Sequence, residues 1–316
     1  MMVYMNFEKD LEEIVAAMFL RSGGRRNQSL GPFRQFAQLF DHADRQVPDK
    51  RYTVHVSSEL QKKSNWFPPK GPLREVITRL EQGQTIRPYL SKEVALLDRF
   101  DRLLRHWRIN HMHLEAVSTV DKQGFVKRSG DLLFFRVEGD RVYLIDILPH
   151  PPRGSTIEWS NSELVQIVDR NWPNLQHLFS NSSPQENVLD DAMYASLRSK
   201  NVNAMVSTAR GSVFVGGGTM ATGESFRAHT EWMLLLRHLA RVQDYVAHEY
   251  SKIFGNVGAY ASAVRLDEIH TTGCTIFDGA SQRHVFIKDA EVNSWFEIPF
   301  PSMKLKRGVF ITHPSA

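Results

Sequence analysis

Apolar residues recur at helical spacing in several segments of the chain. This spacing predicts helices over residues 7–20, 32–40, 73–82, 91–107, 162–170, 193–200 and 226–254. Ser91 is expected to cap the 91–107 helix, because its hydroxyl can accept a hydrogen bond from an orphan backbone N–H. The 226–254 helix is the longest, and its apolar stripe from Trp232 to Val246 predicts a core-facing side or a dimer seam.

Alternating apolar and polar residues predict strands between these helices. The expected strands cover residues 52–58, 109–117, 132–137, 141–148, 263–266, 274–277 and 284–287, with an extended segment over 203–215. Glu138-Gly139-Asp140 supplies a tight turn that joins two of them in a hairpin, and Pro149 stops its second strand. Helices lead, a mainly antiparallel sheet occupies the middle, and a long helix with further strands closes the chain. The predicted fold class is therefore α+β.

The length and composition indicate a globular protein of more than one region. The 316 residues include 42% hydrophobic and 23% charged residues, which suits one large or two ordinary domains. We predict an N-terminal helical region over 1–90, a central α+β catalytic region over 91–180 and a C-terminal α+β region over 187–316. The glycine-rich stretch 216–223 matches no nucleotide-binding motif, and it predicts a flexible turn or lid.

Charge, cysteine content and hydropathy narrow the classes of protein. The formal net charge of +4 permits an anionic partner without demanding one. Cys274 is the single cysteine, which excludes an intrachain disulfide and a cysteine-based zinc site. The acidic N-terminal segment does not resemble a secretory signal, and no apolar run approaches the ~18 residues that span a bilayer. We therefore expect a cytoplasmic protein without a membrane partner.

Residues 106–150 hold the densest candidate chemistry. His111 and His113 alternate on a predicted strand, so they share one face at a spacing of roughly 7 Å. Imidazoles titrate near neutral pH, so such a pair can act as general acid and general base. The same pair can provide two metal ligands. The structural alternative is a pair of partly buried strand histidines with satisfied hydrogen bonds.

The hairpin in this segment reads R-S-G-D-L-L-F-F-R-V-E-G-D-R-V-Y-L-I-D-I-L-P-H. Arg128 leads into the first strand, a Gly-Asp pair follows, the turn is short and acidic, and His150 ends the second strand. Over about residues 107–152 this pattern resembles the central hairpin of the RelE/ParE-type toxins, which have the BECR ribonuclease fold.

The resemblance implies an endoribonuclease that uses no metal. A 2′-hydroxyl attacks the neighbouring phosphate while a base, an acid and cations assist. His150 would act as acid or base, Arg128 and Lys127 would hold the phosphate, and Arg136 would add a further cation. His111 and His113 have no firm counterpart in the family pattern. Arg153 lies near a tryptophan-containing loop, a combination that suits contact with single-stranded nucleic acid and makes Arg153 a further substrate-binding candidate. A tryptophan that holds its loop against the core is the favoured alternative.

Three hypotheses follow, and the sequence leaves the choice between enzyme and binding module open. The preferred one is a metal-independent endoribonuclease without cofactor, with RNA as substrate, in a bacterial toxin or phage-defence setting with an antidote protein. Its catalytic residues would be His111, His113, His150 and Arg128, and its substrate-binding residues Lys127, Arg136 and Arg153.

The alternatives use the same residues differently. The second hypothesis is a metal-dependent phosphoesterase or nuclease, with the three histidines as ligands and Asp146 or Glu115 as an oxygen donor. The third is a non-enzymatic module that binds a protein or nucleic acid through the long helix and the aromatic loops. A homodimer through the 226–254 helix stays open in each of them.

Overall fold

The computed structural model describes residues 2–25, 30–66, 68, 71–115, 120–128, 130–150, 160–175, 179–181, 188–255, 261–270, 272–288 and 305–306. Its contacts form two compact units, a central unit of residues 44–227 and a terminal unit that joins 1–43 to 228–316. Each unit combines helices with a sheet, so the fold is α+β, as predicted. The predicted 91–180 region lies inside the central unit, whereas the predicted 1–90 and 187–316 regions are each shared between the units.

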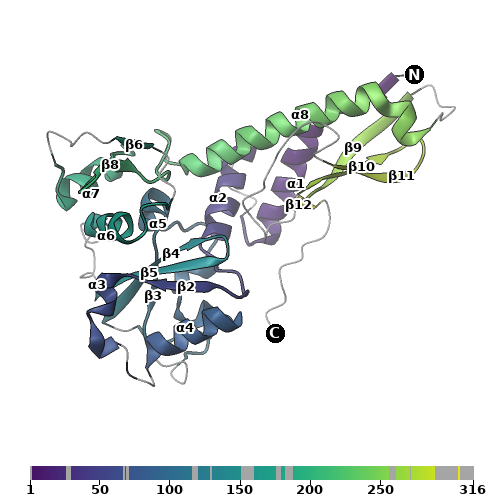
Figure 1. Ribbon diagram of the computed structural model, residues 1–316. Helices are drawn as coiled ribbons and strands as arrows, with labels where there is room; N and C mark the ends of the chain where they lie inside the picture. The colour runs from purple at the N-terminus through teal and green to yellow at the C-terminus, as the bar shows by residue number, and fades with distance from the viewer. Residues whose placement is uncertain are drawn as a thin grey trace. The chain divides into compact units, whose positions relative to one another are not determined.

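A four-stranded sheet organises the central unit (Figure 1). Its strand order is β2-β5-β4-β3, with bounds β2 Thr53–Val56, β3 Asn110–His113, β4 Asp131–Glu138 and β5 Arg141–Pro149. β3, β4 and β5 are antiparallel neighbours, and β2 runs parallel to β5. The turn between β4 and β5 contains Gly139 at φ 58°, a left-handed conformation that favours glycine. The predicted hairpin is thus confirmed.

Helices cover both faces of this sheet. One face packs on α4 (Pro72–Gln82) and α3 (Ser58–Gln61) through a core that includes Leu73, Val76, Leu80, Leu60, Leu133, Phe135, Val142 and Leu144. The opposite face packs on α5 (Arg102–Trp107) and α6 (Glu163–Asn171) through Leu103, Trp107, Leu164, Val168, Leu132, Phe134, Tyr143 and Ile145. The second core extends to α7 (Asp191–Ser199) through Tyr194.

A small three-stranded sheet of order β6-β8-β7 completes the central unit. Its strands are β6 (Phe179–Asn181), β7 (Val206–Thr208) and β8 (Gly211–Phe214). The extended segment predicted over 203–215 is therefore corrected to an antiparallel pair with a turn. Gly211 at φ 127° permits that turn, and the pattern of alternation does not reveal it.

The predicted helix over 91–107 is wrong in its middle. A 3₁₀ turn over Lys92–Ala95 follows Ser91, whose hydroxyl accepts a hydrogen bond from the backbone N–H of Glu93 at 3.4 Å. Leu96 is extended, and α5 begins only after Asp101, whose carboxylate accepts a hydrogen bond from the backbone N–H of Leu104 at 3.0 Å. Asp101 therefore starts a second helix inside one amphipathic pattern.

Gly217 and Gly218 of the glycine-rich stretch pack on α5. The rest of the stretch forms the predicted turn, in which the backbone N–H of Gly223 donates to the carbonyl of Met220 at 2.8 Å, and its flexibility stays a prediction. The backbone N–H of Gly218 donates to the carbonyl of Arg105 at 2.6 Å. A Cβ at Gly217 would lie 2.2 Å from that same carbonyl oxygen. The glycines therefore allow two backbone segments to approach more closely than any side chain permits.

The terminal unit joins the two ends of the sequence. Its elements are α1 (Phe7–Arg21), α2 (Pro32–Asp44), α8 (Phe226–Phe254), β1 (Met2–Tyr4), β9 (Ala261–His270), β10 (Gly273–Asp278), β11 (Arg283–Lys288) and β12 (Leu305–Lys306). β1 pairs in parallel with β9, and the other pairings are antiparallel. The apolar stripe of α8 is buried within the chain, with Trp232 at 5.2 Å from the Phe36 ring. The prediction that this stripe faces the core is therefore confirmed, and the alternative of a dimer seam stays a prediction.

Candidate active site

The two histidines of β3 lie on the sheet face that packs against α5 and α6. His111 pairs across the ladder with Phe134 and His113 with Leu132, and both partners belong to that core. Directly opposed residues of an antiparallel ladder share a face, so the predicted arrangement of the histidine pair is present. Both rings are well covered, with the side chain of His111 13% exposed and His113 5% exposed.

Asp101 holds His111 in place. Its Oδ2 lies 3.0 Å from Nδ1 of His111, while its Oδ1 accepts the backbone hydrogen bond that starts α5. Burial raises the pKa of Asp101, but His111 and the backbone N–H groups of Leu103 and Leu104 outweigh burial and hold that pKa below its usual value. A carboxylate against Nδ1 orients the imidazole and leaves Nε2 for proton transfer.

Sequence reasoning missed Asp101. The signal was an aspartate directly before the Arg102–Trp107 segment, which is a typical N-cap position. The apparent continuity of the 91–107 pattern concealed it.

His113 lies at the centre of the predicted catalytic residues. Its ring stacks on that of His150 at a centroid distance of 5.8 Å and an interplanar angle of 13°. Burial, and then the charges of His111, His150 and Arg128, lower the pKa of His113 to about 4. The other three predicted catalytic residues therefore lie near enough to act on His113 electrostatically. At neutral pH its imidazole is uncharged and able to accept a proton.

A buried nitrogen of His113 adds a second observation. Within the residues that the structure describes, Nδ1 of His113 has no hydrogen-bond partner. Buried polar atoms are normally hydrogen-bonded, so an exception requires an explanation. Nε2 of His55, a strand histidine outside the cluster, shares this property, so the unpaired nitrogen does not by itself set His113 apart from a structural strand histidine.

Lys127 and Arg128 lie at the surface of the central unit. Both are exposed, and together with Lys92, Asp121 and Val126 they line an open hollow of about 450 Å³. Lys92 forms an ion pair with Asp121 in that hollow. Among the described residues, the histidines do not line this hollow. Arg128 lines the hollow and also acts electrostatically on His113, so it links the hollow to the histidines.

The remaining candidates lie elsewhere. Arg136 is 1% exposed and pairs with Glu138 at 2.6 Å, so its guanidinium is enclosed in the protein and badly placed for the predicted phosphate contact. Asp146 pairs with Lys63 at 2.7 Å. Arg153 lies outside the described residues. Within the part of the chain that is described, no three His, Cys, Asp or Glu side chains form a group suited to a metal ion, so the ligand set of the metal-dependent alternative does not assemble there.

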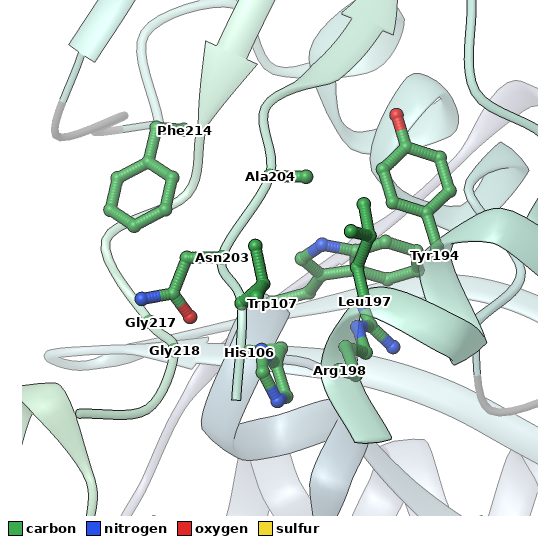
Figure 2. A pocket seen from close by; sticks show the side chains of 11 residues that line it. His106, Trp107, Tyr194, Leu197, Arg198, Asn203, Ala204, Phe214, Gly217 and Gly218 are labelled. Atoms are coloured by element: carbon green, nitrogen blue, oxygen red, sulfur yellow. The ribbon is translucent and has the colours of Figure 1, made fainter. Parts of the chain in front are cut away.

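A separate pocket in the central unit was not foreseen (Figure 2). His106 and Trp107 at the end of α5, Arg198 of α7 and the backbone of Gly217 and Gly218 line it. The glycine-rich stretch is the sequence signal for this pocket, although glycine content alone does not distinguish close packing from a flexible turn.

Comparison with known proteins identifies no relative. No family model matches the chain, and no curated protein and no solved structure matches it either. Among the described residues, no helix combines the length and the apolar composition needed to cross a membrane. The class that the fold and the site define is thus an α+β protein in which two strand histidines, His111 and His113, lie near His150.

Proposed function

We propose that the protein is an endoribonuclease that cleaves RNA by acid–base chemistry without a metal ion. The observation that carries this proposal is the gathering of His111, His150 and Arg128 around His113. Two or more imidazoles and a guanidinium at one place are the groups that phosphodiester cleavage by an internal hydroxyl requires.

The chemistry assigns a role to each group. Neutral His113 accepts the proton of the ribose 2′-hydroxyl as the 2′-oxygen attacks phosphorus. The P–O5′ bond breaks, and His111, oriented by Asp101 at 3.0 Å, donates the proton that the 5′-oxygen takes up. Arg128 compensates the charge that develops on the phosphate oxygens, and His150 stacks on His113 and positions it. The products are a 2′,3′-cyclic phosphate and a 5′-hydroxyl.

The biological setting rests on the hairpin resemblance alone. RelE/ParE-type toxins imply a cytoplasmic enzyme of a toxin or phage-defence system that an antidote protein restrains. Fold-level analogy is a weaker argument than the site itself, so the experiment addresses the chemistry first.

The test is cleavage of a fluorescent single-stranded RNA by the full-length protein in excess chelator. We expect cleavage by the wild type and a loss of at least about 10²-fold in His111→Ala and His150→Ala, the range typical of a removed acid or base. His55→Ala is the matched control, because His55 is a strand histidine of the same unit that stacks on Tyr143 at 4.9 Å, outside the cluster. Full activity in both cluster variants, or cleavage that stops with chelator, would refute the proposal.

A further inference from the structure

Strands β9, β10 and β11 (Figure 1), with β1 beside β9, form a sheet in the terminal unit. Alternate side chains of β9, β10 and β11 are buried in the core, and these are Ser262, Val264, Leu266, Ile269, Cys274, Ile276, Asp278 and Ile287. Successive side chains of a strand point to opposite faces, so the intervening residues form an outer face. Across the strands, the outer face pairs Tyr4 with Ala263, Phe277 with Arg265 and His284, and Thr275 with Glu268 and Phe286.

Aromatic side chains recur on this outer face. Tyr4 is 59% exposed and Phe286 is 40% exposed, and the half-buried Phe277 lies on the strand beside Phe286. Within the described strands β9, β10 and β11, the outer face carries no leucine, isoleucine, valine or methionine. An exposed surface that is aromatic without being aliphatic indicates a partner that is recognised by its flat groups.

The most exposed polar groups of the outer face are hydrogen-bond donors. The side chains of Arg265 and His284 are 48% and 59% exposed, whereas Asp267 between them is 16% exposed. Asp267 lies 3.1 Å from Nε of Arg265 and 2.9 Å from Nδ1 of His284, so one covered carboxylate holds both groups in place. Glu268 is likewise 15% exposed, beside His270. An anionic partner therefore meets the guanidinium and the imidazole before it meets a carboxylate.

Neighbouring groups hold the flat side chains of the outer face in place. The guanidinium of Arg265 lies 4.6 Å from the centre of the Phe277 ring. The rings of Phe286 and His270 meet edge to face at a centroid distance of 5.1 Å. A Cβ at Gly273 would lie 2.9 Å from the Phe286 ring, so glycine leaves that ring room against the sheet. Flat groups that are already positioned lose little freedom when another flat group stacks on them.

We propose that the outer face binds single-stranded RNA, with bases stacked on Tyr4, Phe286 and the guanidinium plane of Arg265. Proteins recognise single strands by stacking bases on aromatic rings and arginine planes, and a sheet face is a common place for them. Exposed donors such as His284 suit the phosphates between those bases. The choice of RNA over DNA rests on the proposed function, whereas the stacking surface lies in the terminal unit, apart from the residues of the histidine cluster.

The test is binding of a fluorescent 2′-O-methyl RNA of about ten nucleotides to the full-length protein, followed by fluorescence anisotropy. This strand has no nucleophilic hydroxyl, so binding is measured apart from cleavage, and either can fail without the other. We expect saturable binding that weakens at least about fivefold in Phe286→Leu and stays unchanged in Phe286→Tyr, because leucine removes the flat ring and tyrosine keeps it. Met233→Ala is the control, since Met233 is 47% exposed on α8 of the same unit.

A second pair of variants tests the charge of the outer face. Arg265→Gln should weaken binding and reduce its salt dependence, whereas Lys252→Gln removes the same charge from α8 and should do neither. Tyr4→Ser replaces Phe286→Leu if that variant does not fold, since the exposed Tyr4 contributes little to the core.

Four results would overturn the proposal. They are the absence of saturable binding, unchanged binding in the variant that removes a ring, equal effects of Arg265→Gln and Lys252→Gln, and binding of a duplex or of single-stranded DNA of the same sequence that is at least as tight.

Discussion

Single side chains determine the chemistry of the histidine cluster. Asp101 performs two tasks with two oxygens, since Oδ1 starts α5 and Oδ2 lies 3.0 Å from His111. The sequence predicts the histidines and Arg128, because residue type and alternation identify them. It does not predict Asp101 as their partner, since the contact depends on how α5 packs on the sheet.

We expect Asp101→Asn to reduce the rate of RNA cleavage by about 10²–10⁴-fold with little change in KM. Asparagine is as good an N-cap as aspartate, so α5 should keep its start. The amide, however, no longer provides the negative charge that orients His111. Cleavage kinetics, together with thermal unfolding, measure the two effects separately.

Two readouts distinguish positioning from a general structural role. In the His111→Ala background, Asp101→Asn should cause little further loss of activity, because the two residues act through one contact. The lowered pKa of Asp101 also means that its carboxylate stabilises the fold above an unfolded-state pKa of 3.8 and that this contribution is lost as the pH falls through the lower folded value. Wild type and variant should therefore converge in stability at acid pH, and fully additive losses of activity would contradict the positioning role.

Helices and strands follow the apolar pattern where packing continues that pattern. The β4–β5 hairpin and α8 lie where the periodicity places them. The break between Lys92–Ala95 and α5 is different, because Val94, Leu103 and Trp107 remain buried on both sides of it. An amphipathic pattern with an interruption thus resembles one continuous helix, and the N-cap residue is the main local sign of the second start.

A substitution in the glycine-rich stretch tests how closely that stretch packs on α5. Gly217→Ala should destabilise the protein by about 1–3 kcal/mol, because the new Cβ would lie 2.2 Å from the carbonyl oxygen of Arg105 and 2.5 Å from that of His106. Denaturant unfolding gives the change in free energy. Gly130→Ala is the control, since a Cβ there meets no atom within 4 Å. Equal stability of the two variants would show that the stretch does not pack on α5 as described.

The sequence predicts the fold class of the whole chain, but it does not predict which distant segments pair with one another. Helix and strand order indicate α+β, and this is observed. Nothing in the local pattern reveals that Met2–Tyr4 pairs with residues 261–263, or that the terminal unit joins both ends of the sequence. Such contacts depend on non-local packing, which periodicity does not encode. For the same reason the pocket lined by His106, Arg198 and Gly217 is visible in three dimensions only.

Identification of the cleavage products is the most direct examination of the proposed chemistry. The full-length protein is incubated in excess chelator with a single-stranded RNA and with a DNA of the same sequence, and the fragment ends are determined by mass spectrometry. An internal attack by the 2′-hydroxyl predicts RNA fragments with 2′,3′-cyclic phosphate and 5′-hydroxyl ends, and intact DNA. Absence of RNA cleavage, equal cleavage of the DNA, or fragments with 5′-phosphate ends would contradict the assignment of His111, His113, His150 and Arg128 to one active site.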